Sequence, residues 1–90
     1  MVTRNANGDL MWLELGNSDA GLTHIIERHS ADLAARGVTD IPGFLRELLQ
    51  TPPTDVGRSA KGPWGIFVHS EREYLLAFGD NGFIVSLYPQ

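Results

Sequence analysis

The chain of 90 residues contains no cysteine and no long apolar run. Without cysteine it can form neither disulfide bonds nor zinc sites built on thiolates, and its redox compartment cannot be inferred. The longest apolar stretches are four or five residues, far short of the roughly 20 that cross a membrane as a helix. The first nine residues contain no apolar signal region, so we expect no export signal in this sequence.

Basic residues are also scarce. Seven lysine and arginine side chains stand against eleven aspartate and glutamate side chains, which gives a net charge of −4. The excess of acidic side chains lies entirely in residues 1–55, because residues 56–90 carry three basic and three acidic side chains. Proteins that bind long nucleic acids nonspecifically are usually basic, because neutralised phosphates release counterions. The chain could contact a few phosphates locally or bind a basic partner, and composition alone slightly favours the second.

The remaining composition is that of an ordinary globular protein, with 42% apolar and 20% charged residues. Residues 1–90 are long enough for one domain with a single core, but too short for a buried substrate chamber. A short apolar run at 10–15 is bounded by glycines and polar residues, and it predicts an edge strand or an extended lead-in.

Two helices are predicted next. Residues 17–19 suit an N-cap and Gly37 suits a helix end, so the first helix should span about 19–36. Its apolar stripe would consist of Leu22, Ile25, Ile26, His29 and Leu33. The second helix should begin at Asp40, with Pro42 in its first turn, and stop at residues 51–53, which read Thr-Pro-Pro.

Beyond that point the apolar pattern changes to a period of two, which is typical of strands. The predicted strands are 56–60, 64–69, 74–78 and 83–88, and the sequence Asp-Asn-Gly before the last strand indicates a hairpin turn. Strict alternation would place Phe83, Val85 and Leu87 on one face of the last strand, with Ile84, Ser86 and Tyr88 on the other. The predicted class is therefore α+β, with N-terminal helices packed on a four-stranded antiparallel sheet.

The segment 21–29 is the most informative part of the chain, because it holds His24, Arg28 and His29. Imidazole suits proton transfer near neutral pH, and guanidinium suits a phosphate or a developing negative charge. His24 and Arg28 are four residues apart and could face one phosphate together. Alternatively, His24 is an exposed residue and Arg28 pairs with a nearby carboxylate.

His29 lies on the predicted apolar stripe, where a histidine that bonds a backbone carbonyl is the commoner case. The five-residue spacing of the two histidines does not fit the zinc-binding pattern H-E-x-x-H, so we expect no metal and no other cofactor. In the second half, Lys61 and Trp64 could place an ammonium and an indole beside a cleft, where the indole would stack on a nucleobase. Alternatively, and more commonly for an aromatic residue that opens a strand, Trp64 belongs to the core. Ser86 and Tyr88 form a hydroxyl pair that either lines a site or coats the wet face of the sheet.

Three stretches of the chain, 13–16, 21–29 and 82–89, resemble small toxin nucleases. These belong to the barnase–EndoU–colicin–RelE-like group of phage proteins and of bacterial polymorphic and contact-dependent inhibition toxins. The similarity runs from about Leu10 onward, and the H-x-x-x-R-H core is its most specific part. The resemblance implies metal-independent cleavage of RNA, commonly tRNA, in the bacterial cytoplasm of a target cell. It also implies delivery as the C-terminal part of a larger secreted or phage protein, and a cognate immunity protein as partner.

Carried over by position, the resemblance makes His24, Arg28, His29, Ser86 and Tyr88 the catalytic group. Lys61 and Trp64 are added as substrate-binding residues from the chemistry of their loop. His24 would be a general acid or base, and His29 either the second proton-transfer group or the residue that orients the first. Two alternatives stay open: a non-catalytic acidic protein-binding module such as an immunity-type partner, or a structural or adaptor domain of a phage protein.

Overall fold

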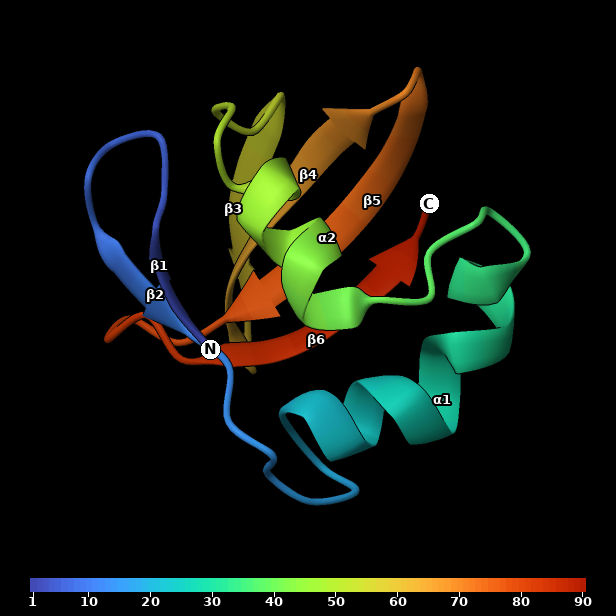
Figure 1. Ribbon diagram of the computed structural model, residues 1–90. Coiled ribbons are helices and arrows are strands. Elements are labelled where there is room, and N and C mark those ends of the chain that lie inside the picture. Colours follow the sequence, from blue (N-terminus) through green and yellow to red (C-terminus); the bar gives the residue numbers. More distant parts are fainter.

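A computed structural model describes all 90 residues and has the α+β class that the sequence predicts. In chain order its elements are β1 (Val2–Arg4), β2 (Leu10–Trp12), α1 (Leu22–Ala34), α2 (Ile41–Leu48), β3 (Asp55–Ser59), β4 (Gly62–His69), β5 (Arg72–Phe78) and β6 (Ile84–Pro89) (Figure 1). β1 and β2 form a two-stranded antiparallel sheet, and β3 to β6 form a four-stranded antiparallel sheet in chain order. Neither helix is long and apolar enough to cross a membrane.

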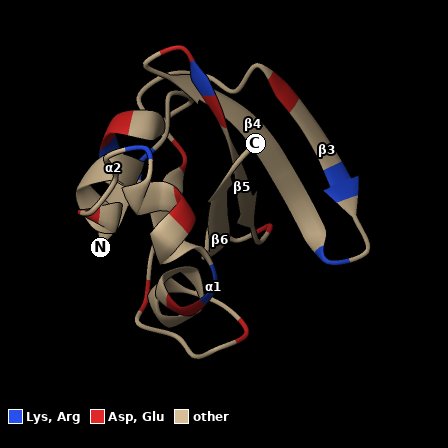
Figure 2. Ribbon diagram, turned by 90° about the vertical axis from the view of Figure 1, so that its right-hand side faces the viewer, with Lys and Arg blue, Asp and Glu red and all other residues tan.

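The two helices relate differently to the larger sheet. α2 lies across one face and contacts β4, whereas α1 runs beside β6 at the edge of the sheet (Figure 1). The expectation that both helices pack on the sheet is therefore matched only loosely. The face opposite α2 carries no helix over β3 to β5, which leaves its side chains available for a site (Figure 2).

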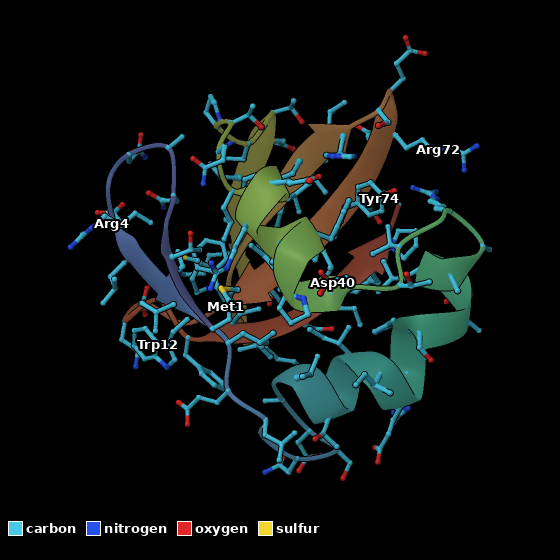
Figure 3. All side chains as sticks on the ribbon, in the orientation of Figure 1. Met1, Arg4, Trp12, Asp40, Arg72 and Tyr74 are labelled. Carbon is cyan, nitrogen blue, oxygen red and sulfur yellow. The ribbon has the colours of Figure 1, made fainter.

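The core lies between α2, the inner side of α1 and the covered face of the sheet. It is one cluster of 15 buried residues: Met11, Leu13, Ile25, Leu33, Val38, Ile41, Phe44, Leu45, Leu48, Leu49, Phe67, Tyr74, Leu76, Ile84 and Leu87. Tyr74 lies beside α2 on this face, where it packs edge-on against Phe44 (Figure 3). The predicted stripe of α1 is wrong at Ile26, which is 47% exposed and lines an open groove between α1 and the start of α2.

α1 begins later than a simple capping pattern indicates. α1 has Gly21 as its N-cap, and the side chains of residues 17–19 do not cap it. Instead, the carbonyls of Glu14 and Leu15 accept hydrogen bonds from the first amides of α1, at 2.9 and 2.8 Å. In α2 the prediction holds, because the Asp40 carboxylate accepts from the amide of Gly43 at 3.2 Å (Figure 3).

The N-terminal segment contains a strand that the sequence pattern did not predict. β1 pairs with β2, and the predicted run at 10–15 is a strand only over Leu10–Trp12. The terminal ammonium of Met1 donates to the carbonyl of Leu13 at 2.9 Å, and the Met1 side chain packs against the core just before β1 (Figure 3). A three-residue strand has too few side chains to show an alternation, which is why β1 leaves no periodic signal.

A β-bulge in β6 alters the predicted alternation of that strand. Ala77 pairs with Ser86 and Phe78 pairs with Ile84, so Val85 is an extra residue without a partner on β5. The extra residue turns Ile84 into the core, where it is fully buried, whereas Ser86 faces the other side. The prediction that Ile84 shares a face with Ser86 and Tyr88 is therefore wrong. The turn before the bulge is the predicted hairpin, with Gly82 at φ +98°.

Candidate functional site

Two rows of side chains cross the uncovered face of the four-stranded sheet. Residues paired across antiparallel strands point to the same side, so the register defines each row. One row runs Gly57, Trp64, Ala77 and Ser86, from β3 to β6. The neighbouring row, two residues along each strand, runs Asp55, Ile66, Leu75 and Tyr88. Both rows end on β6, the strand that lies beside α1.

The two histidines of α1 meet the ends of these rows. His24 Nε2 lies 3.1 Å from the Ser86 hydroxyl, and the His29 ring stacks on the Tyr88 ring with centroids 5.0 Å apart. Five residues of helix advance by about 7.5 Å, and two residues of strand advance by about 6.8 Å. The spacing of the histidines, which does not suit a metal on one helix face, therefore matches the spacing of Ser86 and Tyr88.

These residues line a cavity of about 410 Å³ between α1 and the uncovered face. Residues of α1, of the β3–β4 turn and of β4 to β6 line the cavity. In the ribbon, α1 and the β3–β4 turn lie on opposite sides, with β5 and β6 between them (Figure 2). Its polar and aromatic lining residues are Asp19, His24, His29, Ser59, Lys61, Trp64, Phe78, Ser86 and Tyr88. The other lining residues are small or apolar. Six of the seven site residues named from the sequence therefore lie together in one cavity.

His24 is held at both ring nitrogens. Nδ1 lies 2.9 Å from the backbone carbonyl oxygen of Ser18. A carbonyl oxygen can only accept, so Nδ1 carries a hydrogen and donates it. In the neutral ring, Nε2 is then the unprotonated nitrogen and accepts from the Ser86 hydroxyl. Ser86 is 6% exposed, and this bond satisfies its buried oxygen.

His29 is half-buried and makes no hydrogen bond, contrary to the expectation of a bonded carbonyl partner. It stacks on Tyr88 and meets the His24 ring edge-on, with centroids 5.6 Å apart. Burial lowers the pKa of His29 because the charged ring loses hydration. The charges of His24 and Arg28 lower the pKa further, while Asp32 opposes them. His29 is thus biased towards its neutral, proton-accepting form.

The lowered pKa of His29 predicts a loss of stability in acid. Below the ordinary histidine pKa of about 6.5, the unfolded chain takes up a proton that the folded chain still resists. Stability therefore falls as the pH falls from that value, until the lowered folded-state pKa is reached. We expect His29→Gln to lose less stability than the wild type between about pH 7.5 and about pH 5.5, as measured by urea unfolding. His69→Gln, which alters a histidine outside the cavity, is the control, and equal losses in wild type and His29→Gln would contradict this explanation.

Lys61 and Trp64 border the cavity opposite α1. Lys61 is exposed in the β3–β4 turn, and Trp64 is half-buried near the start of β4. The indole packs over Gly57 of β3, where an added Cβ would lie 2.3 Å from a ring atom. A side chain at position 57 would displace the ring, so this glycine lets Trp64 lie flat beside the cavity. Trp64 is therefore not a core residue, although aromatic residues that open a strand usually are.

Arg28 is the site residue that the structure separates from the others. It is exposed on α1 and does not line the cavity. His24 contacts Ser86 in the cavity while Arg28 is exposed, so the structure does not support the expectation that the two side chains face one phosphate. The charge of Arg28 is the smallest of the contributions that lower the pKa of His29.

Sequence inspection did not name Asp19 or Ser59 as site residues, although both line the cavity. It also missed the carbonyl of Ser18, which bonds His24. A backbone carbonyl has no residue type, so sequence inspection cannot find it. The third histidine, His69, lies elsewhere: it contacts Glu47 at 3.1 Å and packs edge-on against Phe44. It is thus partly packed rather than simply exposed.

No group of three or more histidine, aspartate or glutamate side chains is arranged to hold a metal ion. The cavity offers two imidazoles, three hydroxyls, one ammonium, one carboxylate and one indole, which together can move protons, bind a charged group and stack on a planar ring. Neither a protein-family model nor a curated protein sequence matches the chain.

Proposed function

We propose that this protein is an endoribonuclease that cleaves RNA by attack of a 2′-hydroxyl on the adjacent phosphate. The observation that carries the proposal is the pair of histidines, with centroids 5.6 Å apart, in a cavity that also holds hydroxyls, an ammonium and an indole. Cleavage of this kind needs one group to accept a proton and another to donate one. The resemblance to small toxin nucleases in residues 21–29 supports the same reaction.

We assign His29 as the base and His24 as the acid. The lowered pKa of His29 favours a neutral ring that can take the proton from the 2′-hydroxyl. The 2′-oxygen then bonds to phosphorus, the bond from phosphorus to the 5′-oxygen breaks, and His24 protonates that oxygen. The His24 proton leaves from Nε2, the nitrogen that faces Ser86 and the cavity. A 2′,3′-cyclic phosphate and a 5′-hydroxyl result.

The remaining lining residues supply binding. Lys61 would stabilise the charge on the phosphate, and the hydroxyls of Ser86 and Tyr88 would hydrogen-bond its oxygens. Trp64 would stack on a nucleobase beside the cut, which favours single-stranded RNA. Among the lining residues the only carboxylate is Asp19, so the local charge suits a phosphate better than the net charge of −4 does.

The wider setting follows from the resemblance alone. It places the target among RNAs of a bacterial cytoplasm, with tRNA as the first substrate to try. It also makes this chain the delivered C-terminal part of a larger secreted or phage protein, neutralised by a cognate immunity protein. The packed α+β fold, with its helices followed by four antiparallel strands, is compatible with that group.

Incubation of purified protein with total RNA in excess EDTA tests the proposal. We expect RNA fragments on a denaturing gel, because side chains perform every proton transfer. The net charge of −4 favours one other function, a non-catalytic module that binds a basic protein. That function predicts intact RNA at every protein concentration. Cleavage that EDTA abolishes would replace the side-chain mechanism with a metal-dependent one.

A further inference from the structure

The loop that precedes α1 is connected to the proposed site at one atom, the carbonyl oxygen of Ser18. That oxygen lies 2.9 Å from His24 Nδ1 and determines which ring nitrogen carries the hydrogen. With the hydrogen on Nδ1, the other nitrogen faces Ser86 and the cavity. If the ring carried its hydrogen on Nε2 instead, the Ser18 carbonyl would face an unprotonated nitrogen and the bond would be lost.

The direction of the Ser18 carbonyl depends on Asn17. The Asn17 side-chain oxygen accepts from the amides of Asp19 at 2.8 Å and Ala20 at 3.2 Å. The backbone amide of Asn17 also donates to the carbonyl of Ala20 at 3.0 Å. The peptide that carries the Ser18 carbonyl also carries the Asp19 amide. The bond from Asn17 to that amide therefore sets the plane of the peptide and aims its carbonyl at His24.

The loop closes on itself at its start and is anchored to β6 at its end. Gly16 has φ +65°, and a Cβ there would lie 2.1 Å from the carbonyl oxygen of Ala20, so the loop closes tightly on itself. The Gly21 amide donates to the carbonyl of Val85 at 2.9 Å. Val85 is the unpaired residue of the β6 bulge, next to Ser86. The bulge therefore joins the loop to the strand that presents the hydroxyl partner of His24.

From this geometry we infer that Asn17 is a positioning residue, which holds His24 in its Nδ1-protonated form with Nε2 directed into the cavity. Its role in catalysis rests on the proposed function, whereas its effect on the His24 ring does not. Asn17 is exposed and lies outside the cavity lining, so it acts through the Ser18 carbonyl rather than on the substrate.

The test compares three variants in the full chain. Asn17→Ala removes the acceptor for the two loop amides. Asn17→Asp keeps an acceptor oxygen at the same place, so it should restore the loop. Ser18→Ala keeps the carbonyl and removes only a hydroxyl that makes no hydrogen bond, so it is the matched control. Circular dichroism and thermal unfolding confirm that each variant is folded.

Proton–nitrogen NMR of labelled histidine, above the titration range of the ring, reads the tautomer directly. We expect the Nδ1-protonated form of His24 in the wild type, Asn17→Asp and Ser18→Ala, and a mixture of both forms in Asn17→Ala. In RNA cleavage, we expect kcat of Asn17→Ala to fall about 10- to 100-fold, because a catalytic group is misplaced, with KM little changed.

A wild-type His24 that carries its hydrogen on Nε2 would overturn the inference, as would an unchanged tautomer in Asn17→Ala. Absence of RNA cleavage by the wild type would contradict the proposed function but would leave the NMR result as it stands. The two conclusions can therefore fail separately.

Discussion

We expect His24→Gln to reduce RNA cleavage by about 10²- to 10⁴-fold, the usual contribution of a general acid or base. Glutamine keeps a polar group that can bond the buried Ser86 hydroxyl, but it cannot exchange a proton near neutral pH. The loss should appear in kcat more than in KM, because the proton is transferred in the transition state. Single-turnover cleavage of a short labelled RNA measures this effect without the complication of product release.

The matched control is His69→Gln, which changes the one histidine outside the cavity. His69 pairs with the exposed carboxylate of Glu47, and such a pair contributes about 0–1 kcal/mol. This variant should therefore be folded and cleave RNA at the wild-type rate. Wild-type cleavage by a folded His24→Gln protein would remove His24 from the mechanism, whatever the reaction proves to be.

Truncation of His24 to alanine is less informative than the sequence implies. From the pattern alone, His24 lies off the apolar stripe, and its removal should leave the fold nearly unchanged. In the structure, His24 is the hydrogen-bond partner of the buried Ser86. An alanine would leave that hydroxyl unpaired, at a cost of about 1–3 kcal/mol. His29 makes no hydrogen bond, so the greater stability cost is expected at His24 rather than His29.

The features of the fold that produce a periodic pattern of apolar residues could be predicted from the sequence. The α+β class, both helices and all four strands of the larger sheet follow from apolar patterns, and the start of α2 at Asp40 was correctly predicted. The start of α1 was predicted too early because its first amides bond the carbonyls of Glu14 and Leu15 rather than a side chain. Such a cap depends on where the preceding chain returns, which no local pattern records.

In the site, too, local sequence features were predictable and features that depend on the fold were not. Residue types drew attention to His24, His29, Ser86 and Tyr88, and the structure brings all four together. Their registration was not predictable, because it depends on α1 lying beside β6 and on the bulge at Val85. The prediction that Arg28 belongs to the site lacks support for a related reason. Two residues that are neighbours on a helical wheel need not both lie on the side of the helix that faces the cavity.

The second large effect concerns the substrate. If the nucleophile is the internal 2′-hydroxyl, an RNA with a single 2′-deoxy substitution at the cut position should resist cleavage completely, and DNA should be inert. Neighbouring positions can carry the same substitution without effect, because their hydroxyls take no part in the reaction. A matched series of short RNAs, each with one deoxynucleotide, would locate the required hydroxyl.

The products provide the decisive evidence. Attack by the 2′-oxygen must leave a 2′,3′-cyclic phosphate on one fragment and a 5′-hydroxyl on the other, and mass spectrometry separates these from the products of attack by water. The rate should rise and then fall with pH, because His29 must be neutral and His24 protonated. Since the pKa of His29 is lowered, the acidic limb should lie below the ordinary histidine range near pH 6.5. Equal cutting of DNA, or a 5′-phosphate on the products, would show that the two histidines of this cavity serve a different reaction.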